Sequence, residues 1–477
     1  MQTASKSATL GVNKMFFLRQ IYQWVWGVPT LVLILSVGVY LSLRTGLCQL
    51  RLLPKALRQF FSRFSAKREE ADGVSSFQAL CTALAATVGT GNLAGVAGAL
   101  TLGGPGAIFW MWLCGLLGMV IKFAEATLAI HFRSRNAAGE LVGGPMYMIR
   151  QGLPKRFGPL ASIYALFGVV AAFGVGNATQ VSTVISAVSH IATTFDLVFS
   201  LRGKLLLAAA LALLLGSMLL GGAKRIGRAT EALVPIAAVL YLLLGLTVLI
   251  ARWQMIPNAF LAIFRGAFSP QAVTGGMVGS ALIALRTGIS RGVFTNEAGM
   301  GTASIAHASA AVTHPVEQGM MGIVEVFLDT IVICTITALV ILVSGWPIPY
   351  GTDAGIELTN AAFSNVIGSW VSILLTVALC LFAIATVLGW GLYGLRCAQY
   401  LFGLGGEKVF ALLQVLTIFL SALFRVDAVW LLAEIVNGLM AIPNLIALGA
   451  LTPRLITIYK SYLHGGTYEN FYQCQSL

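Results

Sequence analysis

Long apolar runs, separated by short polar or basic segments, make up most of this sequence. A helix of about 20 residues crosses the hydrocarbon core of a bilayer, and most of these runs reach or approach that length. The first run is too long for a signal peptide and no A-x-A cleavage signal follows it, so we expect a retained span. About eleven transmembrane helices are predicted, at about 22–43, within 77–109, from there to about 130, and at 159–191, 205–221, 231–251, 272–308, 319–345, 367–395, 408–424 and 428–451.

Polar residues and glycines interrupt the second span, residues 77–109, at the segment Thr87-Val88-Gly89-Thr90-Gly91-Asn92. Glycine costs a helix about 1 kcal/mol relative to alanine, and an asparagine in hydrocarbon requires a partner. A broken helix persists at this depth only where it lines a cavity or is buried in protein. Its freed backbone groups suit a small zwitterion and a bare cation. The small-xxx-small spacings Gly91-x-x-x-Gly95 and Ala94-x-x-x-Gly98 also favour close helix packing, and both interpretations stay open.

A second interrupted helix is predicted at 272–308, which is rich in glycine and polar in its second half. A loop at 252–271, containing Pro257 and Pro270, precedes it. Ten spans follow the first one, and an interrupted helix opens each group of five. Because five is odd, the two groups have opposite orientations, which indicates an inverted-repeat transporter with its site at the midplane. The predicted units are an extra helix with a basic, amphipathic, cytoplasmic segment (1–76), two five-helix repeats (77–251 and 252–451) and a cytoplasmic tail (452–477).

Composition and charge agree with a membrane protein and exclude other classes. Of the 477 residues, 58 % are apolar and 10 % are charged, so water cannot be the solvent for most of the chain. The net charge of +13 comes from basic residues between apolar runs, which indicates membrane orientation and no nucleic-acid partner. The seven cysteines form no C-x-x-C pair, and the five histidines show no metal-ligand spacing.

The distribution of Lys and Arg predicts the topology. One set of alternate loops, counted with the end of the interrupted span, carries 21 basic residues and the other set carries 8; leaving out Arg286 and Arg291 of that span gives 19 against 8. The richer side is cytoplasmic by the positive-inside rule. We therefore expect a multi-pass protein of the plasma membrane, in a bacterium the inner membrane, with its N-terminus outside and its C-terminus in the cytoplasm.

Eight motifs together resemble the alanine/glycine:cation symporter family, the sodium/alanine symporters. They cover most of residues 20–450, and the run at 87–112 is highly specific. The motifs are TVGTGNLAGVAGALTLGGPGAIFWMW (87–112), KFAE (122–125), FGVGNATQ (173–180), GISRGVFTNEAGMGTASIAHASA (288–310), HPVEQG (314–319), LDTIVICTITA (328–338), LGWGLYG (388–394) and NGLMAIPN (437–444). The departures are conservative. Thr295 and Thr302 stand where the family usually has serine, Ser304 replaces a usual proline, and Ala385 stands where a hydroxyl is common, which puts one cation ligand in question.

The resemblance implies an all-α, multi-spanning protein with the amino-acid transporter (LeuT-like) fold, made of two five-helix inverted repeats and an extra N-terminal helix. It also implies secondary active import of a small neutral amino acid, alanine or glycine, by symport with Na⁺. A proton-coupled or exchange transporter on the same fold is the alternative. An intramembrane enzyme is disfavoured because the spans contain no HExxH, GxSxG or paired-aspartate pattern. Two interrupted helices favour alternating access over a channel, and we expect a functional monomer in the lipid bilayer.

The first interruption supplies candidate substrate contacts. The freed N–H groups of Thr90 and Gly91 can donate hydrogen bonds to a substrate carboxylate, as the N-terminal ends of half-helices do. The Asn92 side chain is a candidate ligand of the substrate or the cation. An interhelical hydrogen bond is the alternative role for Asn92.

The same interruption supplies candidate ligands for Na⁺. The carbonyl oxygens of Ala85 and Val88 lose their helical partners at the break and are hard donors suited to an alkali cation. The resemblance implies that a later helix completes this site with the Ala383 carbonyl and the Thr386 hydroxyl. By itself, Thr386 would more commonly bond back to its own helix.

Other candidate substrate contacts lie further along the chain. We predict that the second helix breaks at Thr287-Gly288-Ile289, where Gly288 leaves room for an ammonium group and Ile289 walls the side-chain pocket. Phe173, Asn177 and Gln180 follow the i, i+4, i+7 spacing of one helix face, so Phe173 is expected to close over the substrate and Gln180 to bond it. Trp390, one turn beyond the cation site, is a candidate limit on pocket size, although packing is the commoner role of a membrane tryptophan.

Four carboxyl residues well inside apolar stretches of the predicted spans stand out: Glu125, Glu325, Asp329 and Glu434. Ionisable residues in such positions are functional candidates by default, and these keep the proton-coupled alternative open. Lys122 and Glu125 are one helical turn apart, and the simplest expectation is that they pair with each other.

Overall fold

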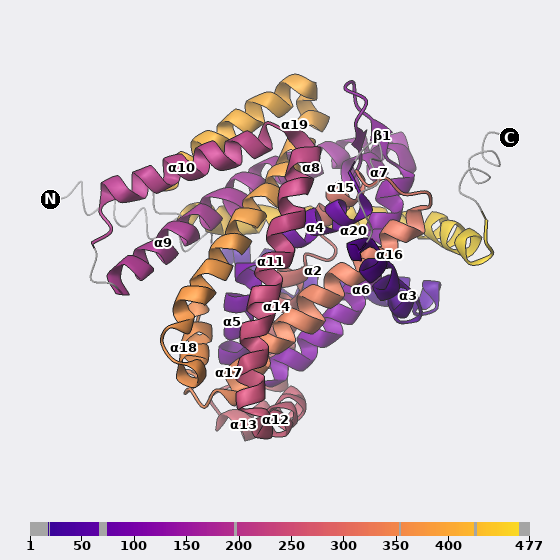
Figure 1. Ribbon diagram of the computed structural model, residues 1–477. Coiled ribbons are helices and arrows are strands. Elements are labelled where there is room, and N and C mark those ends of the chain that lie inside the picture. The colour runs from indigo at the N-terminus through magenta and orange to yellow at the C-terminus, as the bar shows by residue number, and fades with distance from the viewer. Residues whose placement is uncertain are drawn as a thin grey trace, which may run out of the picture.

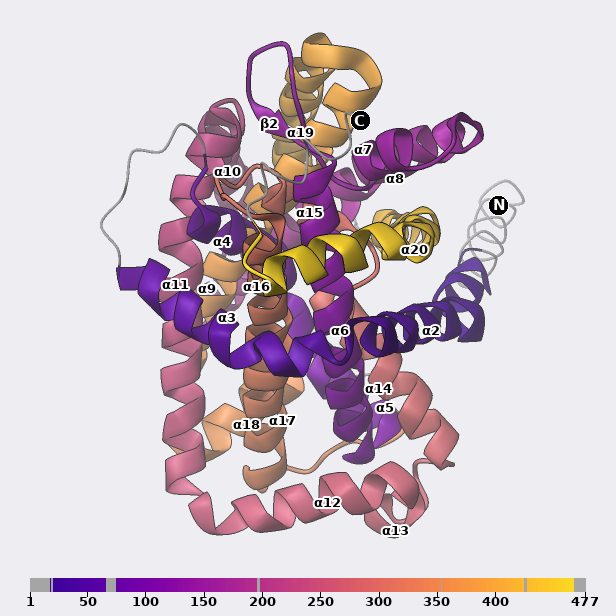
Figure 2. The same cartoon turned by 90° about the vertical axis from the view of Figure 1, so that its right-hand side faces the viewer.

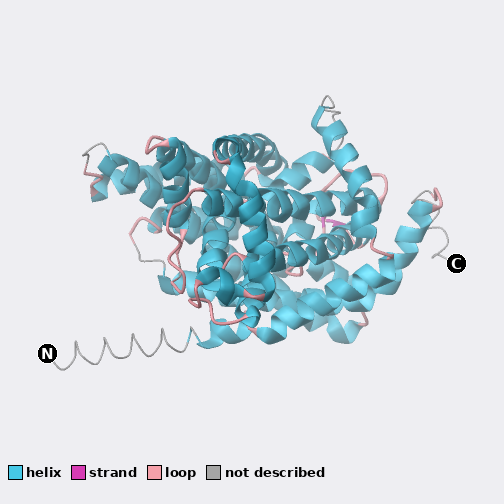
Figure 3. Ribbon diagram, turned by 90° about the horizontal axis from the view of Figure 1, so that it is seen from below, coloured by secondary structure: helices cyan, strands magenta, loops and turns pink. Residues whose placement is uncertain are grey.

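The computed structural model describes residues 18, 20–65, 74–194, 198–352, 354–423 and 427–466. Helices make up nearly all of this part of the chain (Figure 3), as the predicted all-α class requires. Two short strands, β1 (Ser134–Arg135) and β2 (Leu141–Val142), form an antiparallel hairpin.

The first half of the chain forms two helices, a broken helix and then four longer helical segments. The elements are α2 (Val28–Thr45), α3 (Cys48–Ser65), α4 (Ser76–Thr87), the π-helical segment η1 (Gly91–Gly95), α5 (Val96–Gly103), α6 (Gly106–His131), α7 (Pro145–Gly152), the 3-10 turn η2 (Lys155–Phe157), α8 (Gly158–Phe173), the π-helical segment η3 (Gly174–Ala178), α9 (Thr179–Thr194), α10 (Leu201–Leu219) and α11 (Gly222–Ala251).

The second half also has a broken helix near its start, after two short surface helices. Its elements are the 3-10 turn η4 (Trp253–Met255), α12 (Ile256–Phe268), α13 (Pro270–Thr274), α14 (Ala281–Asn296), α15 (Thr302–His307), α16 (Pro315–Val326), the π-helical segment η5 (Phe327–Cys334), α17 (Thr335–Val343), α18 (Ile356–Ile367), α19 (Val371–Leu420) and α20 (Asp427–Leu463).

The described residues contain eight helices that are long and apolar enough to cross a membrane, or nine if the bent pair α4 and α5 is one span. The long α19 consists of two helices that meet at a kink at Gly403, whose φ is 70°. The pair α14 and α15 corresponds to the second predicted interrupted span. The total of eleven spans stays a prediction.

The first predicted break is present. Ser75 begins α4 with a capping box, in which its hydroxyl accepts from the Gln78 N–H and the Gln78 side chain accepts from the Ser75 N–H. α4 ends at Thr87, Val88 is extended, and the chain re-enters a helix with a bend of 51° between Ser76–Thr87 and Gly91–Gly103. The polar, glycine-rich segment therefore interrupts the helix at the predicted place.

The second break lies about ten residues beyond the predicted one. α14 continues through Thr287, Gly288 and Ile289, and it ends at Asn296. The chain then turns through Glu297, Gly299 and Gly301, which have φ values of 51°, 94° and 78°. Positive φ favours glycine, so the two glycines permit this turn, whereas Gly288 is an ordinary helical residue. The prediction of a break at 287–289 was wrong.

The segment predicted as a loop at 252–271 is also helical. α12 begins with Pro257 in its first turn, where the missing N–H needs no partner, and Pro270 likewise opens α13. Figure 2 shows α12 lying across the ends of the upright helices, opposite the end that carries β2. The two prolines start helices and do not exclude them.

The helix α6 lies at the centre of the fold and packs against α14 and α16 (Figures 1 and 2). Glycines allow the close approach: a Cβ atom at Gly322 of α16 would lie 2.8 Å from the carbonyl oxygen of Lys122. The amphipathic helix α3 crosses the outside of α6 and α16, as Figure 2 shows. This arrangement buries the polar face of α6 between the two halves of the chain.

Candidate functional site

A cavity of about 900 Å³ lies beside the first break. Thr90 and Leu93 line it from the break, and Phe294 lines it from α14. The remaining walls come from η3, α9, α18, α19 and α20, through Val175, Thr179, Gln180, Ser182, Thr183, Ser186, Ala187, Ile356, Glu357, Thr359, Asn360, Ala361, Ser364, Leu375, Thr376, Leu379, Leu431 and Glu434. The cavity therefore combines an interrupted backbone with many neutral hydroxyl and amide groups.

Asn92 holds the first break in shape. Its side-chain oxygen accepts from the Gly89 N–H at 2.8 Å, and its amide donates to the Asp329 carboxylate in η5 at 2.7 Å. Asn92 is fully buried and is not among the residues lining the cavity. The interhelical hydrogen bond, the alternative considered from the sequence, is thus present, and direct contact with a ligand stays a prediction.

Thr386 brings the later helix to the same break. Its hydroxyl lies 2.9 Å from the Ala85 carbonyl oxygen and 2.9 Å from the Phe382 carbonyl oxygen of its own helix. A Cβ atom at Gly89 would lie 3.3 Å from this hydroxyl, so glycine allows the approach. Ala383 is buried one turn earlier on α19. Three oxygens from two helices therefore gather next to Gly89 of the first break.

The part of α14 next to the first break is Phe294 and Thr295, which lie against Gly91. A Cβ atom at Gly91 would lie 3.6 Å from Phe294 and 3.6 Å from Thr295. By contrast, Gly288 packs against α6, where an added Cβ would overlap the Ala107 carbonyl oxygen and lie 2.7 Å from the Cβ of Trp110. Phe294 therefore lines the cavity, a position that no pattern in the sequence indicated.

Thr287 and Ile289 also occupy packing positions. The Thr287 side chain lies against Gly103 at the end of α5, and Ile289 is 2 % exposed. Neither residue is among those lining the cavity. A role of Thr287, Gly288 and Ile289 in substrate binding stays a prediction, and their surroundings are those of helix packing.

The π-helical segment η3 separates residues that were expected to share one face. Phe173 and Asn177 face α19, where Phe173 lies 4.8 Å from Phe410 between ring centroids and Asn177 bonds Gln414. Gln180 turns to the cavity, because a π-helical segment inserts an extra residue and shifts the face. The expectation that Gln180 shares one helix face with Phe173 and Asn177 is therefore wrong.

Trp390 lies fully buried against η3. A Cβ at Gly176 would overlap the Trp390 side chain, and the indole packs edge-on to Tyr393 at 5.7 Å. Trp390 is not among the residues that line the cavity. Its position supports the packing role that the sequence left open, and its influence on pocket size stays a prediction.

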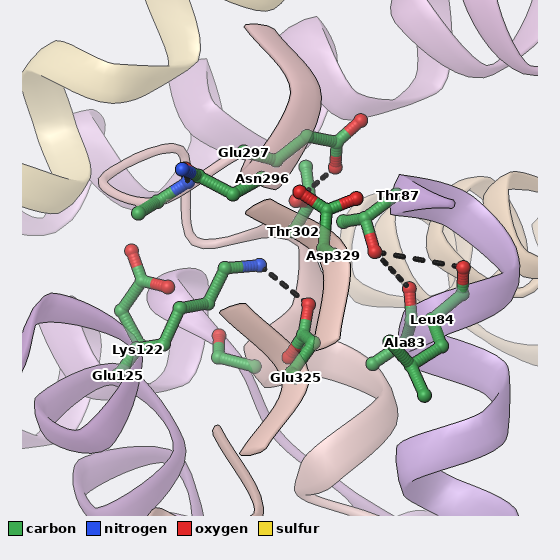
Figure 4. A network of polar contacts seen from close by, with 12 residues as sticks. Ala83, Leu84, Thr87, Lys122, Glu125, Asn296, Glu297, Thr302, Glu325 and Asp329 are labelled. Carbon is green, nitrogen blue, oxygen red and sulfur yellow. Dashed lines mark hydrogen bonds and ion pairs between the residues drawn. The ribbon is translucent and has the colours of Figure 1, made fainter. Parts of the chain in front are cut away.

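Two carboxyl groups, those of Glu125 and Glu297, hold the second break, and Figure 4 draws the contact of Glu297 with Thr302. One oxygen of Glu125 accepts from the N–H groups of Gly299 and Gly301, at 3.0 and 3.1 Å, and from the Asn444 amide at 2.7 Å. Glu297 accepts from the Thr302 hydroxyl at 2.7 Å, across the turn. Anions near the N-terminus of a short helix satisfy its freed N–H groups, so these residues stabilise the start of α15.

Lys122 pairs with Glu325 of α16 and not with Glu125. Its ammonium nitrogen lies 2.8 Å from Glu325 Oε1, and His307 Nε2 lies 3.0 Å from the other oxygen (Figure 4 draws the first contact). Gln318 then connects His307 to Ser76 at the start of α4. The expected pairing of Lys122 with Glu125 within α6 was wrong, because Glu325, 203 residues away in the sequence, binds the Lys122 ammonium group.

The comparisons with known proteins agree on one family. The sequence profile described as the Sodium:alanine symporter family matches residues 12–470. The chain is 44 % identical to an uncharacterized transporter of Haemophilus influenzae, covering 93 % of this chain and 95 % of the relative. It is also 44 % identical to the sodium/alanine symporter AgcS of Methanococcus maripaludis, covering 92 % and 95 %.

A solved structure confirms the fold. The crystal structure of MhsT in complex with L-phenylalanine superposes with a TM-score of 0.55 at 16 % identity, covering 82 % of this chain and 99 % of that one. MhsT has the LeuT-like fold, so the predicted fold class is confirmed. The matched profile, the two close relatives and this shared fold establish that the chain belongs to the sodium:alanine symporter family, a family of membrane-embedded transporters.

Proposed function

We propose that this protein imports a small neutral amino acid, alanine or glycine, by symport with Na⁺. The observation that carries the proposal is the first helix break, where Thr90 lines the cavity and the Thr386 hydroxyl meets the Ala85 carbonyl behind it. Backbone N–H groups and oxygens at one break can bind an anion and a cation at the same time. A zwitterionic amino acid and Na⁺ need that combination.

The substrate carboxylate is assigned to the N–H groups of Thr90 and Gly91. These residues open the half-helix formed by η1 and α5, whose N-terminal end carries partial positive charge. The substrate ammonium group is assigned to the side-chain oxygen of Gln180. That oxygen is buried at the cavity wall and has no hydrogen-bond partner among the described residues, while the amide of Gln180 donates to Val175 at 3.2 Å.

Na⁺ is assigned to the oxygens of Ala85, Val88, Ala383 and Thr386. Carbonyl and hydroxyl oxygens are hard ligands that suit an alkali cation. Thr386 already lies among carbonyl oxygens, and rotation of its O–H away from Ala85 would present a lone pair to the ion. The cation would then stabilise the break on which the substrate carboxylate lies, which gives a physical basis for coupling.

The proposal includes a location and an orientation. The protein acts as a monomer in the plasma membrane, with the N-terminus outside and the C-terminus in the cytoplasm, because basic loops favour the cytoplasmic side. In that orientation the cavity faces outward, since α18 and the C-terminal end of α9 belong to external connections. Import would begin from this state.

Uptake of labelled alanine into proteoliposomes tests the function, with an inward gradient of Na⁺, of Li⁺ or of protons as the only driving force. We expect accumulation with the Na⁺ gradient. Unlabelled glycine should compete, and leucine or phenylalanine should compete poorly, since packed helices limit the space. Accumulation driven by a pH step without Na⁺ would support the proton-coupled alternative, and homo-exchange without any gradient dependence would support an exchanger.

A further inference from the structure

Glu434 of α20 is a buried carboxyl residue that lines the cavity and has no side-chain partner in the part of the chain that the structure describes. Its exposed fraction is 0 %, and neither carboxyl oxygen has a hydrogen-bond partner among the described residues. Leu431, one turn earlier on α20, lines the same cavity. A buried charge without a partner is unfavourable, so a carboxyl kept at a cavity wall indicates a ligand that supplies the missing positive charge.

The three carboxyl groups that the sequence singled out together with Glu434 are engaged by the protein. Glu325 binds Lys122 and His307, Asp329 accepts from Asn92 and Thr330, and one oxygen of Glu125 accepts three donors at the second break. None of the three is among the residues that line the cavity. Glu434 differs from them in both respects.

Glu434 belongs to the wall that continues to the first break. The indole N–H of Trp26 donates to the Glu434 backbone carbonyl at 3.0 Å. The Trp26 ring packs edge-on against Phe294, with centroids 6.4 Å apart, and Phe294 lies beside Gly91. This chain of contacts fixes the backbone of Glu434 beside the cavity that the residue lines.

The charges around the cavity favour a cation there. Among the described lining residues, the charged ones are the exposed Glu357 and the buried Glu434, and the other polar ones carry neutral hydroxyls and amides. Two further charges act on Glu434 from the packed elements, with opposite signs: Arg291 of α14 and Glu297 at the second break. Neutral oxygens next to one carboxylate form a ligand set for a hard monovalent cation.

We propose that Glu434 binds a monovalent cation in the cavity, either Na⁺ or the ammonium group of the amino acid, before that cation reaches the first break. The inference rests on the proposed function and adds a binding position to it. Occupation by the cation compensates the buried carboxylate, so cation binding and the open cavity stabilise each other.

Two titrations of purified protein test this position and distinguish the two cations. Na⁺-dependent thermal stabilisation without amino acid reports Na⁺ binding, and alanine-dependent stabilisation at saturating Na⁺ reports the ammonium group. Glu434→Gln removes the charge and keeps the shape. It should raise the half-saturating concentration in one of the titrations by about tenfold or more. Glu357→Gln is the control, because the Glu357 carboxyl group lines the same cavity but is exposed and screened by solvent. It should change the half-saturating concentration in either titration by less than about twofold.

The outcomes separate the inference from the function on which it rests. A folded Glu434→Gln protein with both titrations as in the wild type would overturn the inference. So would unchanged binding combined with loss of uptake only under a proton gradient, which would make Glu434 a proton site. If the wild type itself responds to neither Na⁺ nor alanine, the proposed function fails as well. Should Glu434→Gln not insert, Glu434→Asp keeps the charge at a shorter reach and should give an intermediate shift, whereas wild-type values would count against the proposal.

Discussion

Lys122 Nζ lies 2.8 Å from Glu325 Oε1, and both side chains are 1 % exposed. The pair joins α6 of the first half of the chain to α16 of the second half. One turn further along α6, Glu125 binds the N–H groups of the second break. The same face of α6 therefore holds both a neighbouring helix and the interrupted one, and movement of either would have to break buried charge contacts.

Breaking this ion pair should destabilise the protein strongly. Lys122→Met leaves the Glu325 carboxylate buried with His307 alone, and loss of one member of a buried pair costs about 3–5 kcal/mol. We expect a large fall in the apparent melting temperature of the detergent-solubilised protein. The double variant Lys122→Met with Glu325→Met should recover most of that loss, because no charge is then left unpaired. Recovery by Lys122→Met with Glu125→Gln instead would show that the pair lies within α6.

Thr386→Val should weaken the response to Na⁺ more than it disturbs folding. Valine keeps the shape of threonine and removes the oxygen that lies 2.9 Å from the Ala85 carbonyl. Loss of one ligand should raise the Na⁺ half-saturation of alanine uptake markedly. Thr417→Val, in the second helix of α19 beyond the Gly403 kink, is the control, since that hydroxyl bonds back to Leu413 of its own helix. An unchanged Na⁺ titration for Thr386→Val would remove Thr386 from the cation site.

Gly288→Ala should destabilise the protein, although alanine favours a helix by about 1 kcal/mol. The added Cβ would overlap the backbone carbonyl of Ala107, which a side-chain rotation cannot relieve, so α14 and α6 must separate. Gly449→Ala in α20 is the control, because a Cβ there meets nothing within 4 Å. We expect a lower melting temperature for the first variant and an equal or higher one for the second. Equal stability of the two variants would contradict the close packing at Gly288.

His314 should make stability depend on pH at the start of α16, outside the apolar span. Its Nδ1 accepts from the Val316 N–H at 3.1 Å, which requires an unprotonated nitrogen. Burial lowers the pKa of His314 from 6.5 to about 4 in the folded protein. Between these values the unfolded chain binds more protons, so this stabilisation is complete above pH 6.5 and is lost as the pH falls toward 4. His314→Asn keeps a capping side chain that does not titrate, and its melting temperature should fall less over that range. Identical pH profiles for the two proteins would exclude His314 as the cause.

The orientation predicted from the basic loops can be tested with reporters. A protein that folds only in the cytoplasm, fused after Leu477, should be active. A reporter that works only in the periplasm should be inactive at the same position. The opposite pattern would overturn the assignment to the cytoplasmic side of the loops richer in Lys and Arg, which carry 19 basic residues when Arg286 and Arg291 of α14 are left out.

The sequence by itself determined the membrane class, the family and the first break. A bilayer requires long apolar segments with few charges, so the membrane class can be recognised without tertiary information. The first break could be located because two glycines and three polar side chains occur together within six residues, and no continuous helix in hydrocarbon tolerates that combination without a reason. The meeting of Thr386 with the Ala85 carbonyl came from the family resemblance, since nothing local to either segment indicates the other.

Only the tertiary structure decided the place of the second break and the partner of Lys122. Gly288, Gly299 and Gly301 are the same residue type in one polar segment, but Gly288 packs against a backbone carbonyl and the other two adopt positive φ. Glu125 and Glu325 are equally able to pair with an ammonium group, and the backbone N–H groups of the second break occupy the nearer one. A glycine or a charge has several uses in a buried helix, and which one applies depends on neighbours that the fold brings from hundreds of residues away.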